Sequence, residues 1–157
     1  MQQQATFGAG CFWGVEALFA TQPGVISTSV GYMGGHTPKV DYKAICQGDT
    51  GHAEVVQITF NDEIISFADL MQVFWQNHNP TTPNRQGPDV GTQYRSVIFY
   101  HTPEQQQQAI KERQQLDSNG SFPAPLVTII EAASQYHVAE EYHQQYLAKR
   151  GQTSCSI

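Results

Sequence analysis

A cysteine near the N-terminus stands in a setting that favours reactivity, within Gly10-Cys11-Phe12-Trp13-Gly14. The apolar residues that follow it recur with helical spacing, so a helix is predicted to begin at Cys11. The unpaired N–H groups and the positive dipole at a helix start favour the thiolate, which is the nucleophilic form. The two glycines would let another molecule approach the sulfur closely. The pattern predicts a reactive thiol, while a buried corner with an unreactive cysteine is the alternative interpretation.

A second group suited to chemistry is Glu54, which lies in a predicted strand over residues 52–60. The same face of this strand carries Val56, Ile58 and Phe60. A carboxyl group among apolar side chains loses hydration, so its pKa rises and it can donate a proton near neutral pH. The alternative is a position at the end of the strand, where backbone or water would bind it.

The other two cysteines, Cys46 and Cys155, are far from Cys11 and form no C-x-x-C pair. Neither a zinc site nor a disulfide scaffold is indicated, and the six histidines include no HExxH motif. Cys155 lies in an aperiodic tail that could bring a second thiol to the first. A nucleophilic cysteine with a mobile partner is typical of redox chemistry, in which a sulfenic acid condenses to a disulfide.

Two other functions remain compatible with these residues. In a cysteine hydrolase or acyl transferase, His52 or His143 would take the proton of Cys11 and the thiolate would attack a carbonyl. In a redox-sensing binding module, the same thiols would form a disulfide without turnover of a substrate.

The composition is that of a globular protein with a small acidic excess. Of 157 residues, 39% are hydrophobic, and the formal net charge is −6 with eight scattered lysines and arginines, which argues against nucleic-acid binding. No apolar run of membrane length and no secretory pattern are present, so we expect a cytoplasmic protein. One domain over residues 1–157 is predicted, with residues 1–4 frayed and 149–157 a mobile tail.

Strand and helix patterns alternate along the chain. Helices are predicted to begin at Ser66 and Thr102, each with a capping residue, and an amphipathic helix is predicted from Val138 to Leu147. Loops rich in glycine and proline separate several of these elements. Strands are predicted at residues 5–7, 25–32, 52–60, 94–100 and 126–130. This order predicts an α/β fold of the α+β two-layer type, with one mixed sheet and helices packed on it.

Several ordered motifs together resemble the peptide methionine sulfoxide reductase A family, from about Phe7 to Leu147. They are Gly10-Cys11-Phe12-Trp13-Gly14, Gly31-Tyr32 with Gly34-Gly35, Gly51-His52-Ala53-Glu54-Val55-Val56, Asn84-Arg85-Gln86-Gly87, Gly91-Thr92-Gln93-Tyr94-Arg95-Ser96 and Tyr142-His143-Gln144. The resemblance implies a ferredoxin-like plait with long loops over the active site. It also implies the repair of oxidative damage by reduction of the S epimer of methionine sulfoxide, free or in proteins.

The resemblance also assigns roles to residues. Cys11 would attack the sulfoxide sulfur and leave as a sulfenic acid, while Glu54 protonates the oxygen. The hydroxyl groups of Tyr42 and Tyr94 would assist Glu54. The remaining positions concern the substrate, with Phe12 and Trp13 cradling its methyl group and Asp89 and His143 at further binding positions.

For the return half of the cycle, the resemblance implies that Cys155 resolves the sulfenic acid as a disulfide with Cys11, which thioredoxin or another dithiol reduces. No prosthetic group or metal is expected, Cys46 is interpreted as structural, and a monomer is expected. Two departures from the family pattern occur. Val90 stands where arginine is common, and residues 135–138 lack the usual aromatic-proline approach to the last helix.

Overall fold

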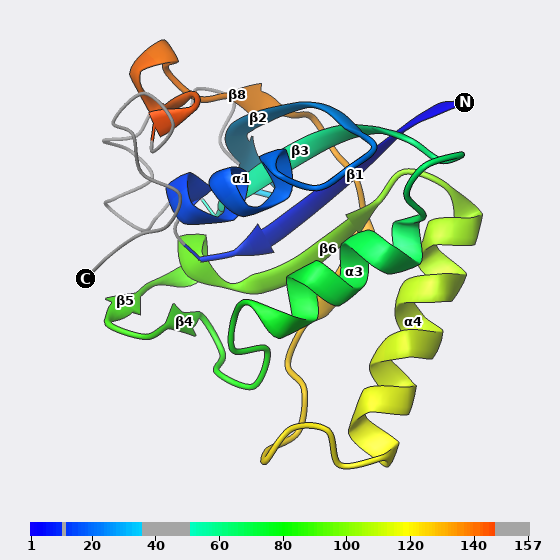
Figure 1. Cartoon of the computed structure of the whole chain (residues 1–157). Helices are drawn as coiled ribbons and strands as arrows, with labels where there is room; N and C mark the ends of the chain where they lie inside the picture. The colour runs from blue at the N-terminus through cyan, green and yellow to red at the C-terminus, as the bar shows by residue number, and fades with distance from the viewer. Residues whose placement is uncertain (11, 36–50, 147–157) are drawn as a thin grey trace.

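The computed structural model describes residues 1–10, 12–35 and 51–146, and these residues build one six-stranded sheet (Figure 1). Its strand order is β7-β6-β1-β3-β2-β8. Neighbouring strands are antiparallel except β6 and β7, which are parallel, so the sheet is mixed as predicted. The strands are β1 (Gln2–Ala9), β2 (Val25–Met33), β3 (Ala53–Asn61), β6 (Ser96–Tyr100), β7 (Ile129–Ala132) and β8 (His137–Val138).

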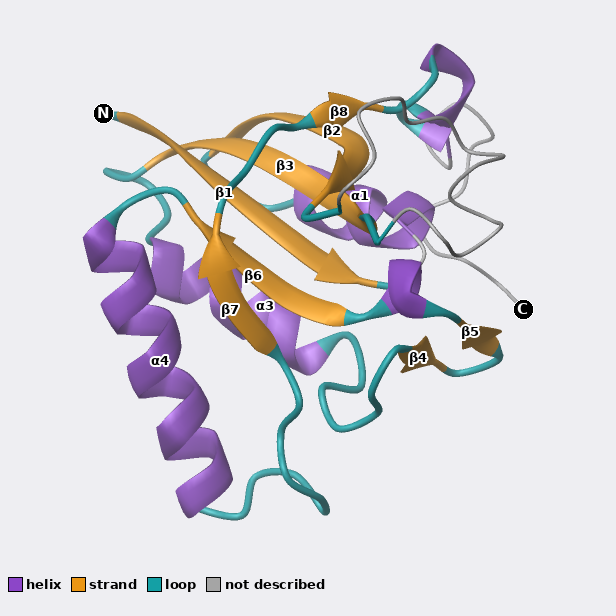
Figure 2. Ribbon diagram, turned by 180° about the vertical axis from the view of Figure 1, so that it is seen from behind, coloured by secondary structure: helices purple, strands orange, loops and turns teal. Residues whose placement is uncertain are grey.

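Two helical crossovers interleave the four central strands. Helix α1 (Phe12–Ala20) leads from β1 to β2, and β3 lies between these strands. Helix α3 (Phe67–Gln76) leads from β3 to β6, and β1 lies between those. This double split βαβ arrangement is the ferredoxin-like plait that was expected. Helices α1 and α3 cover one face of the sheet, and α4 (Pro103–Ser118) lies beside α3 near β6 and β7 (Figures 1 and 2).

The main core fills the space between the sheet and these helices. Phe7 of β1 stacks on Phe19 of α1 and on Phe74 of α3, with ring centroids 5.3 Å and 5.1 Å apart. The predicted capping of α3 is confirmed, because the Asp69 N–H donates to Ser66 Oγ and the Ser66 N–H donates to the Asp69 carboxylate. These contacts hold α1 and α3 rigidly against the strands that carry the site.

The opposite face of the sheet is partly covered by the chain itself. After β7, the backbone crosses this face to reach β8 at the other edge (Figure 2). Tyr136 in this crossing segment packs against Met33, Val55 and Phe99, and its hydroxyl group is 2.8 Å from Ser29 Oγ. In the described residues, no helix is both long and apolar enough to cross a membrane.

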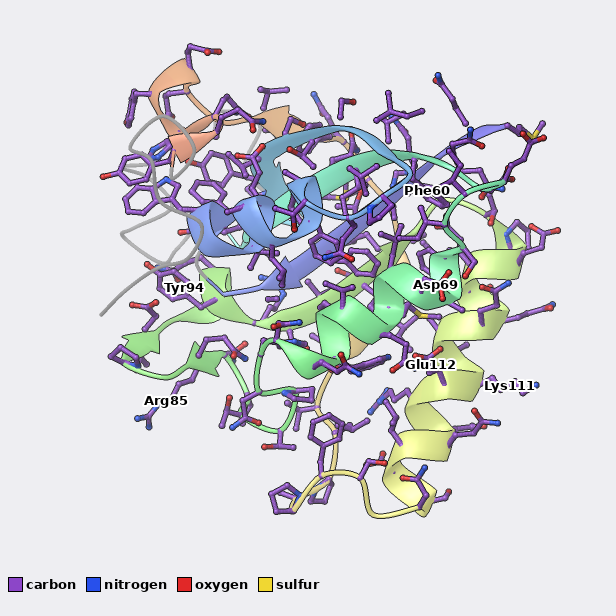
Figure 3. All side chains as sticks on the ribbon, viewed as in Figure 1. Phe60, Asp69, Arg85, Tyr94, Lys111 and Glu112 are labelled. Atoms are coloured by element: carbon purple, nitrogen blue, oxygen red, sulfur yellow. The ribbon has the colours of Figure 1, made fainter. Side chains whose placement is uncertain are left out.

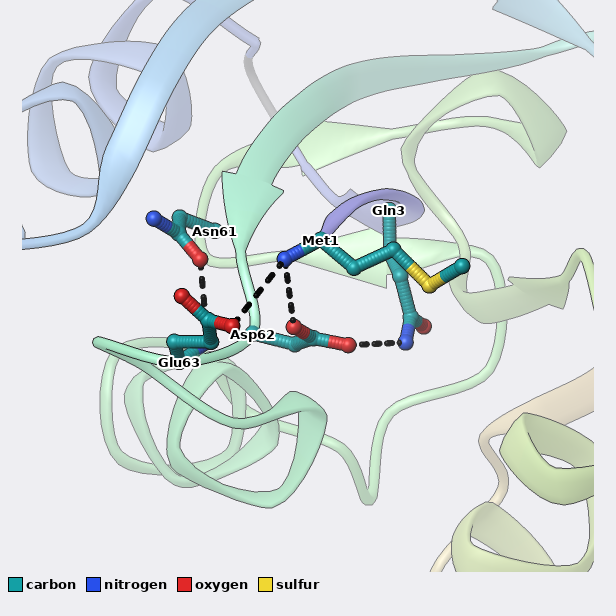
Figure 4. A network of polar contacts seen from close by, with 5 residues as sticks. All are labelled: Met1, Gln3, Asn61, Asp62 and Glu63. Carbon is teal, nitrogen blue, oxygen red and sulfur yellow. Dashed lines mark hydrogen bonds and ion pairs between the residues drawn. The ribbon is translucent and has the colours of Figure 1, made fainter.

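The expectation that residues 1–4 fray is wrong for Gln2 to Gln4, which pair with β3 in β1. A polar network at the strand end contributes to this order (Figure 4). The terminal ammonium lies 3.2 Å from the Asp62 carboxylate, to which the Gln3 amide also donates at 2.7 Å. These interactions lower the pKa of Asp62, the Gln3 hydrogen bond most of all.

Two predicted strands begin later than expected. Tyr94 lies in a 3-10 turn, η1 (Thr92–Tyr94), and β6 starts at Ser96. The other strand, β7, starts at Ile129 rather than Leu126. The Leu126 N–H donates to the Asp117 carboxylate at the end of α4, and this side-chain bond takes the place of a sheet partner.

The predicted amphipathic helix is wrong for residues 138–145, while Tyr146 has helical backbone. Residues 137–145 contain β8 and one 3-10 turn, η2 (Glu141–His143). The Gln144 side chain accepts from the Val30 N–H and donates to the Val30 carbonyl oxygen, so it pairs with β2 like a strand. Gln145 then adopts a φ of 54°, which a right-handed helix does not allow.

Candidate active site

The start of α1 is organised by a close contact at Gly10. This residue has a φ of +95°, and a Cβ atom there would lie 2.8 Å from the Gln86 side chain. The positive φ and this close approach of Gln86 both require glycine at position 10. Cys11 follows directly in the chain and lies outside the described residues, as do Tyr42, Cys46 and Cys155. As predicted, the helix begins at this point, with Phe12 as the first residue of α1.

Gln86 belongs to a small hairpin of β4 (Arg85–Gln86) and β5 (Asp89–Val90), which the sequence indicated only as a polar loop. Its amide oxygen accepts from the Asn79 N–H at 2.9 Å, and its amide nitrogen donates to the Asn79 carbonyl oxygen at 2.6 Å. The hairpin is therefore fixed to the turn that follows α3. Asp89, paired with Gln86, is half-buried and acts electrostatically on Glu54.

Glu54 is almost completely buried, with 2% of its surface exposed. Burial raises its pKa to about 8, a hydrogen bond from the Phe12 N–H to Oε1 at 3.3 Å opposes the rise, and the charge of Asp89 adds to it. The carboxyl group is thus a neutral acid at pH 7, at the first N–H group of α1. The pKa shift inferred from the strand pattern is confirmed.

The aromatic side chains of α1 contact the C-terminal segment. Burial lowers the pKa of His143, so its imidazole is neutral at pH 7, and Nδ1 accepts a hydrogen bond from Trp13 Nε1 at 2.9 Å. This bond places the imidazole proton on Nε2, which faces the Glu140 carboxylate at 3.2 Å. On Trp13, the ring of Tyr146 stacks with a centroid separation of 3.9 Å.

The two rings next to Cys11, to which the family resemblance assigns the substrate methyl group, differ in exposure. Phe12 is buried, with its ring 5.7 Å from that of Tyr32 and 5.3 Å from that of His143. Trp13 is half-buried. Of this pair, Trp13 therefore presents the accessible aromatic surface, and it packs against the buried cluster to which Phe12 belongs.

Tyr94 comes from another direction. It lies on η1, which contacts β3, and Figure 3 shows it at the end of the sheet where α1 begins. The structure thus gathers the described candidates Phe12, Trp13, Glu54, Tyr94, Asp89 and His143 at this end of the sheet. In the parts of the chain that are described, no group of three histidine, cysteine, aspartate or glutamate side chains could hold a metal ion.

The sequence analysis missed Glu16, a buried carboxylate on the same face of α1 as Phe12 and Phe19. The four-residue spacing from Phe12 was the available signal, because a charged residue on the apolar face of a helix requires a partner. Its partner, Gln145, was assigned to a helix that does not form over the described residues.

Comparison with known proteins gives consistent matches. A family model described as peptide methionine sulfoxide reductase matches residues 3–157. The chain is 56% identical over 153 residues to peptide methionine sulfoxide reductase MsrA of Methanoculleus marisnigri, covering 98% of this chain and 93% of that protein.

Solved structures match as well. Reduced Mxr1 from Saccharomyces cerevisiae superposes with a TM-score of 0.90 at 36% identity, covering 96% of this chain and 87% of Mxr1. Mxr1 in complex with Trx2 matches with a TM-score of 0.65 at 22% identity, over 92% of this chain and 84% of that one, which is a likeness of fold.

Proposed function

Because the chain belongs to the peptide methionine sulfoxide reductase family, and is therefore a methionine sulfoxide reductase, we propose that it reduces the S epimer with Cys11 as nucleophile and Glu54 as acid. The observation that carries this assignment is the buried carboxyl group of Glu54, with a pKa of about 8, at the N–H of the residue after Cys11. A proton donor at the start of the helix that follows the candidate nucleophile suits this reaction, since a sulfoxide oxygen leaves poorly unless it is protonated.

In the proposed first step, the Cys11 thiolate attacks the sulfoxide sulfur while Glu54 gives its proton to the oxygen. The S–O bond of the substrate breaks as its protonated oxygen moves to the Cys11 sulfur, and the transient bond between the two sulfur atoms breaks as well. Methionine is released and Cys11 becomes a sulfenic acid. Methionine sulfoxide is reduced by two electrons and the cysteine sulfur is oxidised by two. Glu54 is left as a carboxylate and regains its proton from solvent, and the hydroxyl groups of Tyr94 and Tyr42 assist at the oxygen.

The proposed recycling uses Cys155. Its thiol attacks the sulfenic acid of Cys11, water leaves, and a Cys11–Cys155 disulfide remains for thioredoxin or another dithiol to reduce. The complex of the similar protein Mxr1 with Trx2 supports thioredoxin as the partner. In this cycle Cys46 takes no part, and all the electrons pass through thiols, so no prosthetic group is required.

For the substrate, we assign the methyl-binding surface to Trp13, supported from below by Phe12. The hydrogen bond from Trp13 Nε1 to His143 fixes the indole plane, and Tyr146 covers part of it. Asp89 has an indirect part, since its charge helps to keep Glu54 protonated. We expect the chain to act as a monomeric single catalytic domain in a reducing compartment such as the cytoplasm, where its thiols stay available.

Single-turnover reduction of the two separated methionine sulfoxide epimers, without added reductant, tests this function. One methionine per enzyme from the S epimer alone, with a Cys11–Cys155 disulfide found by mass mapping, is the expected result. Cys11→Ser should give none. Turnover of neither epimer by folded, reduced protein would return the function to the cysteine hydrolase or the redox sensor.

A further inference from the structure

Glu16 is a buried carboxylate that the proposed chemistry does not use. It lies on α1 with 1% of its surface exposed. Three donors converge on it, namely the Thr28 hydroxyl group at 2.9 Å, the Gln145 backbone N–H at 2.8 Å and the Gln145 side-chain amide at 2.7 Å. Two of the three come from one residue of the C-terminal segment, so Glu16 ties that segment to the helix that begins after Cys11.

Gln145 is held in an uncommon backbone conformation. Its φ of 54° lies in the left-handed region, which residues other than glycine rarely adopt. A residue in this region persists only where its surroundings hold it there. The carboxylate of Glu16 does so by accepting from both the backbone and the side chain of Gln145, and the Gln145 amide also donates to the Thr28 carbonyl oxygen at 3.2 Å.

The conformation of Gln145 decides where the chain goes next. The following residue, Tyr146, stacks on Trp13 at 3.9 Å, so the described chain ends over the ring that follows Cys11 by two positions. Before Gln145, the side chain of Gln144 is fixed to Val30 and Ala139. Gln145 is therefore the residue at which a firmly held segment turns toward the candidate site.

We propose that Glu16 is a positioning residue for the resolving step, acting through Gln145 to hold Tyr146, after which the chain leads to Cys155, over Trp13. This inference rests on the proposed function for the identity of the two cysteines. The step itself joins the Cys11 sulfenic acid and the Cys155 thiol into a disulfide with loss of water. Glu16 takes no part in the bonds that form or break.

The backbone preference of Gln145 sets the expected size of the effect. An ordinary residue favours right-handed over left-handed conformations by about five- to thirty-fold. When Glu16 no longer holds Gln145, the fraction of molecules with Tyr146 stacked on Trp13 should fall by about this factor. Disulfide formation should slow accordingly, and the release of methionine, which precedes it, should not.

Glu16→Gln and a matched pair at the partner, Gln145→Ala and Gln145→Gly, test the proposal. Methionine release and the Cys11–Cys155 disulfide are timed separately in rapid-quench single turnovers at saturating sulfoxide, so that a change in substrate affinity caused by a displaced Tyr146 does not enter the two rates. Glu16→Gln and Gln145→Ala should release methionine within about two-fold of the wild-type rate but form the disulfide about five- to thirty-fold more slowly. Gln145→Gly, which adopts positive φ freely and retains its backbone N–H, should stay within about three-fold of wild type.

The decisive measurement is which of the two variants, Gln145→Ala or Gln145→Gly, forms the disulfide more slowly. A purely structural role predicts that the more flexible glycine variant is at least as impaired as the alanine variant, and that result would overturn the proposal. Equal slowing of both steps, or an unchanged disulfide rate, would overturn it as well. The Gln145 pair decides the question if Glu16→Gln does not fold.

Oxidation by hydrogen peroxide separates this inference from the proposed function. Peroxide converts the Cys11 thiol to a sulfenic acid and water without any sulfoxide, and disulfide formation can then be timed alone. If the wild-type protein forms the disulfide this way but reduces neither epimer, the proposed function fails while the positioning role is still measured. If methionine release is normal and the variants resolve at wild-type rate, only the positioning role fails.

Discussion

Two buried carboxyl groups, that of Glu16 on α1 and that of Glu54 on β3 beside the start of α1, differ in the hydrogen-bond donors described around them. Glu54, 2% exposed, accepts from the Phe12 N–H at 3.3 Å within the described residues. Glu16, 1% exposed, accepts three hydrogen bonds of 2.7 to 2.9 Å. Equal burial therefore accompanies two different sets of described contacts. Burial raises the pKa of Glu54, so that it retains a proton that it can give away, while the donors around Glu16 make it a fixed acceptor.

The largest expected effect separates these two groups by chemistry. Glu54→Gln keeps the shape of the side chain but cannot supply the proton, so methionine release in a single turnover should slow by about 10²- to 10⁴-fold. Glu16→Gln is the matched control and should leave this step nearly unchanged. Similar decreases in the rate of methionine release in both variants would contradict the assignment of Glu54 as the acid and of Glu16 as a residue that acts only through Gln145.

The same substitution, Glu54→Gln, should have the opposite effect on stability: it slows the reaction but stabilises the folded protein at high pH. The folded pKa of Glu54, about 8, exceeds the ordinary value of 4.5, so between these pH values the folded state binds more protons and stability falls as the pH rises. Glu54→Gln removes this cost and should be more stable than wild type at pH 9 by on the order of 3 kcal/mol.

Urea unfolding of wild type and Glu54→Gln at pH 5 and pH 9 measures this difference. At pH 5 the wild-type carboxyl group is protonated in the folded state, so the advantage of the variant should be much smaller. An advantage that does not change between the two pH values would show that Glu54 is not held neutral by burial.

A smaller effect is expected where the C-terminal segment touches the substrate surface. His143→Phe keeps an aromatic ring but removes the acceptor of the Trp13 Nε1 hydrogen bond. The loss of one such bond should raise KM by about five- to ten-fold with kcat within about two-fold. His143→Gln retains a possible acceptor and should show a smaller rise. Steady-state kinetics of both variants checks whether this contact orients the substrate or takes part in the chemistry.

The smallest effect on the reaction should come from a substitution that touches neither Glu16 nor Glu54. Ser66→Ala removes the cap of α3 and should cost about 1 kcal/mol of unfolding free energy in urea titrations. Methionine release and disulfide formation should both keep their wild-type rates at 25 °C. Slowing of either step would mean that the rates of the Glu16 and Gln145 variants report general stability rather than position.

The sequence was most informative where local rules decide the structure. Helix starts at Phe12, Ser66 and Thr102 depend on local sequence signals, and the pKa of Glu54 followed from its alternation with apolar neighbours. Residues 138–145 were wrongly predicted as part of a helix because their apolar spacing is helical. Their actual structure depends on side-chain bonds from Gln144 to β2 and from Gln145 to α1, which no local pattern contains.

The hydrogen-bond partners of Glu16 could not be predicted from the sequence for the same reason. A glutamate within an apolar helix face indicates that some partner exists, but it does not say which of the distant donors that partner is. The role of Gly10 was half predictable. Its need for a positive φ follows from a tight turn, whereas the contact with Gln86 depends on how a hairpin far along the chain folds back.

The hydrogen bond between Trp13 and His143 joins positions 130 residues apart in the sequence. A ribosome adds about 5 to 20 residues per second, so Trp13 waits about 6 to 26 s after its own synthesis before its partner exists. Throughout that interval Phe12 packs on Tyr32 without the imidazole of His143, so two parts of the candidate site that lie far apart in the sequence are joined only at the end of synthesis.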